Sequence, residues 1–326
     1  MTPDADPRLV AGRARGPAFD AAVARNGYLW WYLDAVSDDG QHALTLIAFV
    51  GSVFSPYYAM ARRLGRGDPQ HYCALNVALY GKAGKRWALT ERGRHDLQRD
   101  ADHLQIGPSS LRWQGDELII DINEITSPWP ARLRGTIRLT PAALPTQAFA
   151  LDGAGRHRWQ ACAPLAHVAV ELQQPALRWQ GTAYLDSNSG SEPLEDGFAG
   201  WHWSRTHTGT GTQVAFDLLP RQGSGTALAV QFSPDGSAAL IEPPRQQPLP
   251  ASRIWRIDRR ALLPGTAAQV LATFEDTPFY ARSLLRQGSG SNVHLSMHES
   301  LSLTRFASPL IQLLLPFRMP RWARSR

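Results

Sequence analysis

Lysine is almost missing from this sequence of 326 residues. Lys82 and Lys85 are the only lysines among its 34 basic residues, and all the others are arginines. The arginines are scattered among acidic residues rather than gathered in a stripe, so the net charge of +6 does not predict nucleic-acid binding. An anionic membrane surface is a more suitable partner for a modest positive excess.

Cysteine is equally scarce. Cys73 and Cys162 lie far apart and match no metal or redox spacing, so we expect two buried thiols. The first twenty residues contain no apolar core before a cleavage site, which predicts that there is no signal peptide. Together these features favour a reducing cytoplasm.

Long apolar runs are absent as well. No stretch reaches the roughly 18 to 20 apolar residues that a membrane-spanning helix needs. Residues 42–54 come nearest, but Gly51 and Ser52 interrupt them, which favours a buried strand and turn. At the C-terminus, Leu310 to Phe317 precede Trp322 and several arginines. This tail predicts an anchor at a membrane interface, and docking on the protein's own core is the alternative.

Several motifs of chemistry are missing too. The sequence has no Gly-rich phosphate loop, nucleophile elbow or dinucleotide fingerprint. On a strand His294 and His298 would lie about 13 Å apart, too far to share one metal ion, and His202 and His207 do not match a metal motif. We therefore expect neither a metal nor a cofactor. The carboxylates of residues 192–196 fall in a Gly/Ser/Pro-rich loop, where solvated charge is the usual explanation.

What is present is a series of short apolar segments separated by turns such as SDDG, GKAG and SPDG. This spacing predicts an all-β barrel or sandwich. The sequence LRWQG occurs at residues 111–115 and again at 177–181, as duplicated β domains would produce. The chain is accordingly divided into an N-terminal extension (1–26), a first domain (27–165), a second domain (166–308) and a tail (309–326).

Three short motifs combine aromatic and polar residues at i, i+2 spacing, so that the paired residues share one face of a strand. They are His157-Arg158-Trp159, Tyr184-Leu185-Asp186 and Trp201-His202-Trp203. One acid, one imidazole and several aromatic faces suit chemistry on a cation formed from an apolar molecule, because aromatic faces stabilise positive charge without trapping it. The filling of a barrel interior is the alternative explanation.

The segments GYLWWYLDAV, HYCALNVALYG, HRWQACAPLAHVAVEL, LRWQGTAYLDSNSGSEPLEDGF and GWHWSRTH resemble the acyclic carotenoid 1,2-hydratase family, also called hydroxyneurosporene synthases. The resemblance extends from about Gly27 to the tail. It implies two lipocalin-like β-barrel domains in tandem and the addition of water to the terminal C1=C2 bond of an acyclic carotenoid such as neurosporene or lycopene. No cofactor or metal is implied.

The family's His-x-Trp and Tyr-x-Asp pairs correspond here to His157 with Trp159 and to Tyr184 with Asp186. Our hypothesis is that Asp186 delivers a proton to C2, for which an apolar cavity must keep its carboxyl group protonated. Tyr184 would bond that carboxyl group, Trp159 would stabilise the cation at C1, and neutral His157 would orient the attacking water and accept its proton. The alternatives are that Asp186 only caps the SNSG turn and that Trp159 is ordinary core.

Trp201 and Trp203 are expected to form the outer wall of the substrate site, with His202 beside them. The substrate resides in lipid, so the protein is expected to lie peripherally on the inner or intracytoplasmic membrane and to take the carotenoid from it. A non-catalytic lipocalin-like carrier is the alternative function. The intact motifs favour the hydratase, because a carrier gains nothing from burying an acid that costs desolvation energy. The oligomeric state is not predicted.

Overall fold

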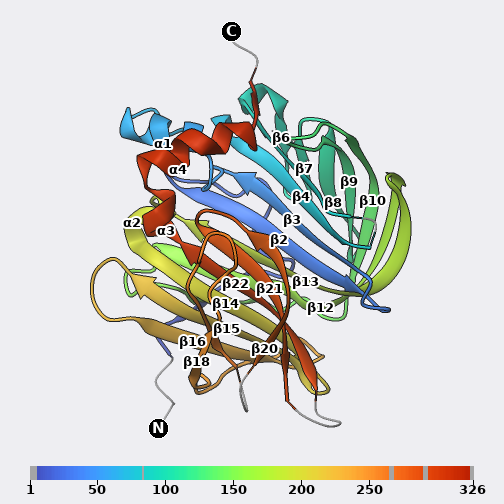
Figure 1. Ribbon diagram of the computed structural model, residues 1–326, viewed down its shortest axis with the longest axis vertical. Helices are drawn as coiled ribbons and strands as arrows, with labels where there is room; N and C mark the ends of the chain where they lie inside the picture. Colours follow the sequence, from blue (N-terminus) through green and yellow to red (C-terminus); the bar gives the residue numbers. More distant parts are fainter. Residues whose placement is uncertain (1–5, 83, 264–267, 289–292, 324–326) are drawn as a thin grey trace. The chain divides into compact units, whose positions relative to one another are not determined.

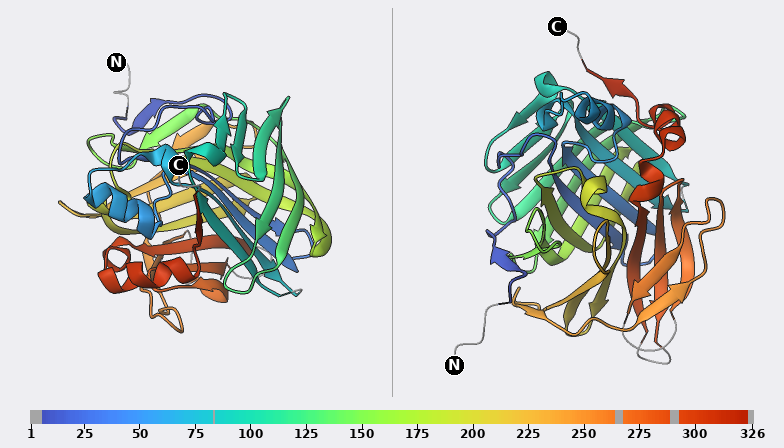
Figure 2. Two further views of the ribbon diagram at one scale, coloured as in Figure 1. Left: turned by 90° about the horizontal axis from the view of Figure 1, so that it is seen from above. Right: turned by 90° about the vertical axis from the view of Figure 1, so that its left-hand side faces the viewer.

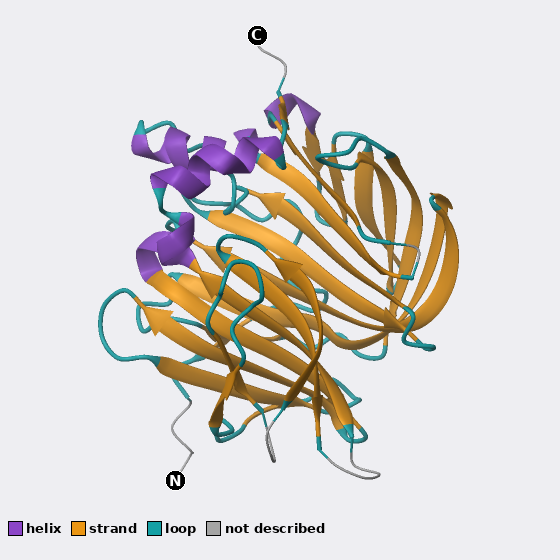
Figure 3. Ribbon diagram, viewed as in Figure 1, coloured by secondary structure: helices purple, strands orange, loops and turns teal. Residues whose placement is uncertain are grey.

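The structure is a computed structural model that describes residues 6–323, apart from 83, 264–267 and 289–292. The chain divides into two compact units, one formed by Met1–Pro193 with Leu313–Arg326 and the other by Leu194–Gln312. Strands dominate both units, and the helices are short (Figure 3). The expectation of a β protein is therefore confirmed at this level.

The first unit is built on one large sheet. Its strands are β1 (Leu9–Ala11), β2 (Tyr28–Ser37), β3 (His42–Val50), β4 (Cys73–Gly81), β5 (Arg86–Arg92), β6 (Leu97–Arg99), β7 (His103–Ile106), β8 (Ser109–Gln114), β9 (Glu117–Ile125), β10 (Arg132–Pro141), β11 (Gln147–Ala150), β12 (His157–Gln174), β13 (Ala176–Gly190) and β23 (Arg321–Trp322). Their order is β23-β5-β4-β3-β2-β13-β12-β10-β9-β8-β7-β6, with β11 and β1 attached beside β12. Except for parallel β23 and β5, all these neighbours are antiparallel.

The sheet curls into a half-barrel (Figures 1 and 2). Strands β4 and β5 come back against β7 and β9, which closes the curve around a hydrophobic core. Alternate residues of the strands fill that core, as Leu133, Ile137 and Leu139 of β10 do, while the residues between them point away. The opposite face of β2 and β13 lies outside this core and carries other side chains.

Both cysteines lie in this core as free, buried thiols, as expected. Burial raises the pKa of Cys73 to about 12. The thiols are therefore ordinary packing groups and poor nucleophiles at neutral pH.

Short helices complete the first unit: α1 (Pro56–Arg63), η1 (Pro69–His71) and η2 (Arg94–Asp96). The chain enters α1 through Ser55, whose hydroxyl oxygen accepts a hydrogen bond from the backbone N–H of Tyr58, and Pro56 occupies the first turn.

The domain boundary predicted at residue 165 falls inside β12, and the two units divide at Pro193 and Leu194 instead. Strands β12 and β13 form a long hairpin that continues on both sides of residue 165, with an irregularity in its pairing between Ala163 and Ala166. Both copies of LRWQG lie in this one unit, in β8 and β13, so the repeat marks two strands of one sheet and not two domains. Residues 6–26 also belong to the unit, because β1 pairs with β11 and Phe19 is buried in the core.

The second unit contains a smaller antiparallel sheet. Its strands are β14 (Phe198–Thr208), β15 (Gly211–Pro220), β16 (Thr226–Phe232), β17 (Ala238–Leu240), β20 (Gln269–Asp276), β21 (Tyr280–Gln287) and β22 (His294–Ser302), in the order β17-β16-β15-β14-β22-β21-β20. A two-stranded ribbon, β18 (Gln246–Leu249) and β19 (Arg259–Leu262), and the short helices α2 (Leu194–Gly197) and α3 (Leu303–Phe306) complete it. The ribbon packs on the sheet through Leu262, which contacts Ala215 and Ala229.

The C-terminal tail follows α4 (Pro309–Leu314) and η3 (Leu315–Phe317). Leu315 and Met319 are buried, and Arg321 forms an ion pair with buried Glu91 where β23 pairs with β5. The tail from Leu315 onward is thus docked on the first unit. In the described part of the chain, no helix is long and apolar enough to cross a membrane.

Candidate active site

The side chains with candidate chemistry lie on the face of the sheet turned away from the hydrophobic core. Leu33 and Leu185 belong to the core, so their neighbours in β2 and β13 point to the opposite face. In the register of the two strands Asp186 faces Tyr32 and Tyr184 faces Asp34. These four side chains are also buried. The site is therefore on the sheet's second buried face and not inside the filled half-barrel.

The carboxyl group of Asp186 is the centre of the first cluster. Its Oδ2 accepts hydrogen bonds from Nε1 of Trp159, at 2.9 Å, and from the hydroxyl of Tyr184, at 2.8 Å. Only 3% of Asp186 is exposed. Burial, and then the neighbouring Asp186, raise the pKa of Tyr184 well above its usual value, so the phenol remains a donor at neutral pH. The structure thus brings together three of the four predicted catalytic residues.

Two alternatives from the sequence can be decided on this geometry. Residues Ser187 to Gly190 continue β13, so Asp186 does not cap a turn there. Trp159 is buried against Phe149, with ring centroids 5.4 Å apart, but its N–H is directed at the carboxyl group of Asp186. Trp159 is therefore more than a core residue, because it also donates a hydrogen bond to this carboxyl group.

His157 forms a second cluster with partners of its own. Its Nδ1 lies 2.9 Å from the hydroxyl of Tyr28, and its Nε2 lies 3.1 Å from Oε1 of Glu192. In the register of β12 and β13, His157 faces Gly190, four residues beyond Asp186, which corresponds to about 13 Å along the strand. His157 is thus well separated from Asp186, and both of its ring nitrogens contact protein groups.

The protonation state of His157 follows from these partners. Burial lowers the pKa of His157, and the hydrogen bond to Glu192 opposes that shift only in part. Because a carboxylate can only accept, Nε2 carries the hydrogen and Nδ1 accepts the hydrogen bond of Tyr28. Glu192 also pairs with Arg156, at 3.0 Å, so it is a bound partner of the site and not the solvated loop charge that the sequence predicted.

Gly190 provides the space for this second cluster. A Cβ atom there would lie 2.4 Å from a ring carbon of Tyr28 and 2.9 Å from Nδ1 of His157. Any larger residue would therefore push the two rings apart.

A second Tyr-x-Asp pair was missed by the sequence reasoning. Tyr32 donates a hydrogen bond of 3.2 Å to Oδ2 of Asp34, and Asp34 has no exposed surface. The rings of Tyr32 and Tyr184 meet edge to face with centroids 6.4 Å apart. The signal was available, because the letters YLD occur at 32–34 and again at 184–186.

The predicted substrate-binding residues Trp201, His202 and Trp203 lie on β14 in the second unit. Neighbouring residues of a strand point to opposite faces, so His202 cannot line the same surface as the two tryptophans. His202 bonds the hydroxyl of Ser300 through Nδ1, at 2.9 Å, and His298 approaches the same hydroxyl at 3.1 Å. The structure thus assigns His202 to a polar histidine–serine cluster of this unit.

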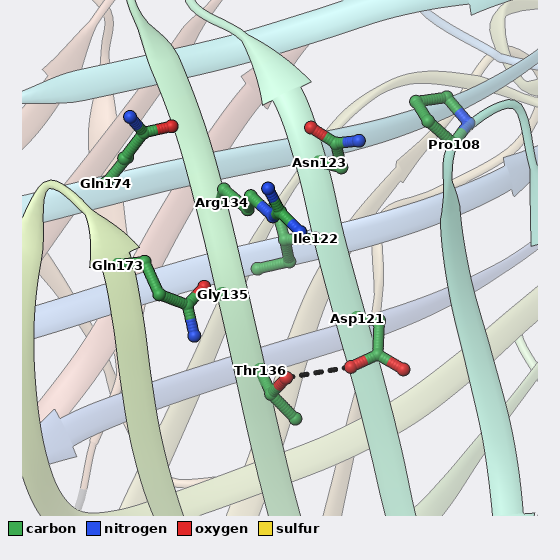
Figure 4. A pocket seen from close by; sticks show the side chains of 9 residues that line it. All are labelled: Pro108, Asp121, Ile122, Asn123, Arg134, Gly135, Thr136, Gln173 and Gln174. Atoms are coloured by element: carbon green, nitrogen blue, oxygen red, sulfur yellow. Dashed lines mark hydrogen bonds between the residues drawn. The ribbon is translucent and has the colours of Figure 1, made fainter.

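One pocket of about 670 Å³ lies on strands β9, β10 and β12 of the first unit (Figure 4). Its lining includes Asp121, which accepts a hydrogen bond of 2.8 Å from Thr136, and it contains none of the predicted site residues. Most of the other lining residues are polar: Asn123, Arg134, Gln173 and Gln174. A polar pocket without aromatic residues does not suit an apolar polyene, so we do not place the site there. No group of His, Cys, Asp and Glu in the described ranges could hold a metal ion.

Comparison with known structures first defines a class. A crystal structure of an AttH protein from Nitrosomonas europaea is 16% identical, has a TM-score of 0.58 and covers 85% of this chain and 92% of its own. Kievitone hydratase from Nectria haematococca is 6% identical, with a TM-score of 0.51, and covers 89% of this chain and 98% of its own. At these identities the likeness concerns the fold alone. The chain therefore belongs, by fold, with these β-rich proteins.

Comparison of sequences identifies the family. The model of the carotenoid hydratase CrtC family matches residues 46–326. The acyclic carotenoid 1,2-hydratase of Thiocapsa roseopersicina is 56% identical over 309 residues, which cover 94% of this chain and 76% of that protein. The enzyme of the same name from Rubrivivax gelatinosus is 49% identical over 311 residues, with the same coverage. The chain belongs to the carotenoid hydratase family, as its motifs predicted.

Proposed function

We propose that this protein is a hydro-lyase that adds water to the terminal C1=C2 bond of acyclic carotenoids such as neurosporene and lycopene. The observation that carries the proposal is the buried carboxyl group of Asp186, which is held by two aromatic donors in a chain of the carotenoid hydratase family. Hydration of an isolated alkene needs a proton donor and a surface that tolerates a cation, and this cluster supplies both.

In the proposed reaction, Asp186 gives its proton to C2, and the π electrons of the double bond form the new C–H bond. Since Oδ2 already accepts two hydrogen bonds, the transferred proton is carried on Oδ1. The product of this step is a carboxylate, and hydrogen bonds to a charged group contribute about 1.5–3 kcal/mol each. Trp159 and Tyr184 therefore stabilise the charge that develops as the proton leaves.

Water then attacks the tertiary cation at C1. In this proposal His157 orients the attacking water through the hydroxyl of Tyr28. It does not contact the water directly, because both of its ring nitrogens are bonded to protein groups. Trp201 and Trp203 remain in the proposal as aromatic residues for the polyene, whereas His202 is left out of it.

We also propose that each unit is a lipocalin-like domain, which the curled sheet of the first and the antiparallel sheet of the second support. The protein would work at the inner or intracytoplasmic membrane, where its substrate resides. Exposed Leu313, Leu314, Phe317 and Trp322 support a lipid contact, and we call these four residues the tail patch.

The proposed function is tested by the mass of the carotenoids in a lycopene-producing host that expresses the chain. We expect a product heavier by one or two waters, and we expect Asp186→Asn to abolish it. Asp116→Asn, at a surface carboxylate that is 83% exposed, serves as the matched control and should form product normally.

Product formation by Asp186→Asn at the native level would show that Asp186 is not the acid. No product from the folded native chain would overturn the hydratase proposal and favour the lipid carrier.

A further inference from the structure

The second buried carboxyl group on the site's face has no role in the reaction described so far. Asp34 lies on β2 beside β13, in the sequence Tyr32-Leu33-Asp34, which repeats Tyr184-Leu185-Asp186 letter for letter. Because the strands are antiparallel, each tyrosine faces the aspartate of the other motif. The two motifs thus form a square of two phenols and two carboxyl groups.

The two carboxyl groups occupy the diagonal of this square. Diagonal neighbours on paired strands are about 7–8 Å apart at their Cα atoms and somewhat closer at Cβ. Each carboxyl group has a phenol as donor: Tyr184 bonds Oδ2 of Asp186 and Tyr32 bonds Oδ2 of Asp34. Both groups are buried, with 3% of Asp186 and none of Asp34 exposed.

The square thus places two buried carboxyl groups on one face, each bonded by a phenol. One can donate a proton to the alkene while the other accepts a proton from the attacking water. Inverting glycosidases likewise use two carboxyl groups, one as the acid and one as the base for the attacking water.

We propose that Asp34 is a second catalytic residue, the base that accepts the proton released by the attacking water. The inference rests on the proposed function. Asp186 donates its proton to C2 and becomes a carboxylate, while a lone pair of the water oxygen forms the C1–O bond. One water proton passes to the carboxylate of Asp34, and its return to Asp186 restores the pair. The sum is the addition of one water molecule, with no other reactant.

His157 is a poorer candidate for this base. It lies about 13 Å along the strand from Asp186, and both of its nitrogens are engaged, whereas Asp34 is the diagonal neighbour of the acid.

The experiment separates protonation of the alkene from addition of water. Purified native protein and variants are incubated with detergent-dispersed lycopene in D₂O, and both the hydroxylated product and the recovered lycopene are analysed for mass and deuterium. Deuterium is first transferred to C2, and loss of a proton from C2 then returns lycopene that carries deuterium. This exchange needs the acid that protonates the alkene, but it does not need the base that accepts a proton from water.

For Asp34→Asn we expect hydration to fall by about 100-fold or more, while deuterium still enters the recovered lycopene. For Asp186→Asn we expect both to be lost. Asp38→Asn, at an exposed carboxylate in the turn after β2, is the matched control and should resemble the native protein. If Asp34→Asn does not fold, Tyr32→Phe provides the second variant, and it should lower hydration more than exchange.

Native-like hydration by folded Asp34→Asn would overturn the inference. A parallel loss of hydration and exchange would also overturn it, because Asp34 would then only hold Asp186 in place. Failure of the native protein to hydrate lycopene would instead reject the proposed function, so the two failures can be distinguished.

Discussion

At the scale of single residues, the site depends on how one carboxyl oxygen is bonded. The N–H of Trp159 and the hydroxyl of Tyr184 both point to Oδ2 of Asp186. In the proposed reaction these bonds become charge-assisted when the proton leaves, so they would be stronger after proton transfer than before it. Interactions that strengthen along the reaction raise the turnover number and not only the binding of substrate.

Trp159→Phe tests this argument, because it keeps an aromatic ring and removes only the N–H donor. The loss of one hydrogen bond to a charged group, about 1.5–3 kcal/mol, predicts that kcat falls by about 10- to 100-fold with little change in KM. Steady-state kinetics on dispersed lycopene measure both constants. Trp113→Phe, at a tryptophan of β8 that packs on the core, is the control. A change in KM alone would mean that Trp159 serves binding and not the acid.

Residue spacing found the pairs that share a face within one strand, and the family resemblance added Trp159 to the set, but neither predicted the contacts between strands. The i, i+2 spacing of Tyr184 and Asp186 was sufficient to place them together. Their contacts with Trp159 and Tyr32 depend on the register of three strands that are distant in sequence. Glu192 was missed for the same reason, since only the fold brings its loop to His157.

At the scale of elements, β14 and β22 of the second unit carry histidines that are buried, such as His298, or half-buried, such as His207. Burial is the main cause that lowers the pKa of His298, to about 3, and burial also lowers the pKa of His207, to about 2. In the unfolded chain these groups bind protons near pH 6.5. Their neutral forms therefore contribute stability that is complete above pH 6.5 and is lost as the pH falls from there toward 3.

Protonation of each of these histidines in the unfolded chain should lower the free energy of unfolding by about 1.4 kcal/mol when the pH is lowered from 8 to 5.5. We expect the protection of the β14 and β22 amides, measured relative to their intrinsic exchange rates at each pH, to fall over this range, and His298→Asn to reduce that fall. His95→Asn, at an exposed histidine, should leave the pH dependence as it is in the native protein. An unchanged pH dependence in His298→Asn would contradict the assignment.

Among the predictions about elements, the least accurate was the domain boundary that we inferred from the LRWQG repeat. LRWQG marks strands of one sheet because Leu, Trp and Gly at these spacings suit a half-buried strand, wherever in the fold it lies. Domain boundaries depend on which strands pair, and the long β12–β13 hairpin crosses the predicted boundary. The mostly β character of the chain, in contrast, follows from local strand and turn signals and was predicted correctly.

At the scale of the whole molecule, the tail has two faces. Leu315 and Met319 are buried and Arg321 is paired with Glu91, whereas the tail patch is exposed. Arg318 lies over the ring of Trp87, 4.4 Å from its centroid, which fixes the segment between the two faces. Docking of the tail on the core is therefore compatible with the proposed lipid contact, because the buried residues dock the tail while the tail patch stays exposed.

This arrangement predicts salt-sensitive binding to vesicles that contain anionic lipid. The double variant Phe317→Ser/Trp322→Ser should weaken binding by about tenfold or more, since each aromatic side chain contributes on the order of 2 kcal/mol when buried. Vesicle co-sedimentation measures the change, with Leu9→Ser, at another exposed apolar residue, as the control. Equal binding by the double variant and the native protein would show that the patch does not contact lipid.

The filled half-barrel has a consequence for how this protein can change. Its strands divide two tasks between alternate residues: Leu33 and Leu185 maintain the core, while Asp34 and Asp186 face the other way. Many enzymes place their reactive groups in the cavity that also determines stability, so a gain in one is often a loss in the other. Here the core and the opposite buried face use different residues of the same strands, so a substitution in the core need not replace any residue of the candidate site.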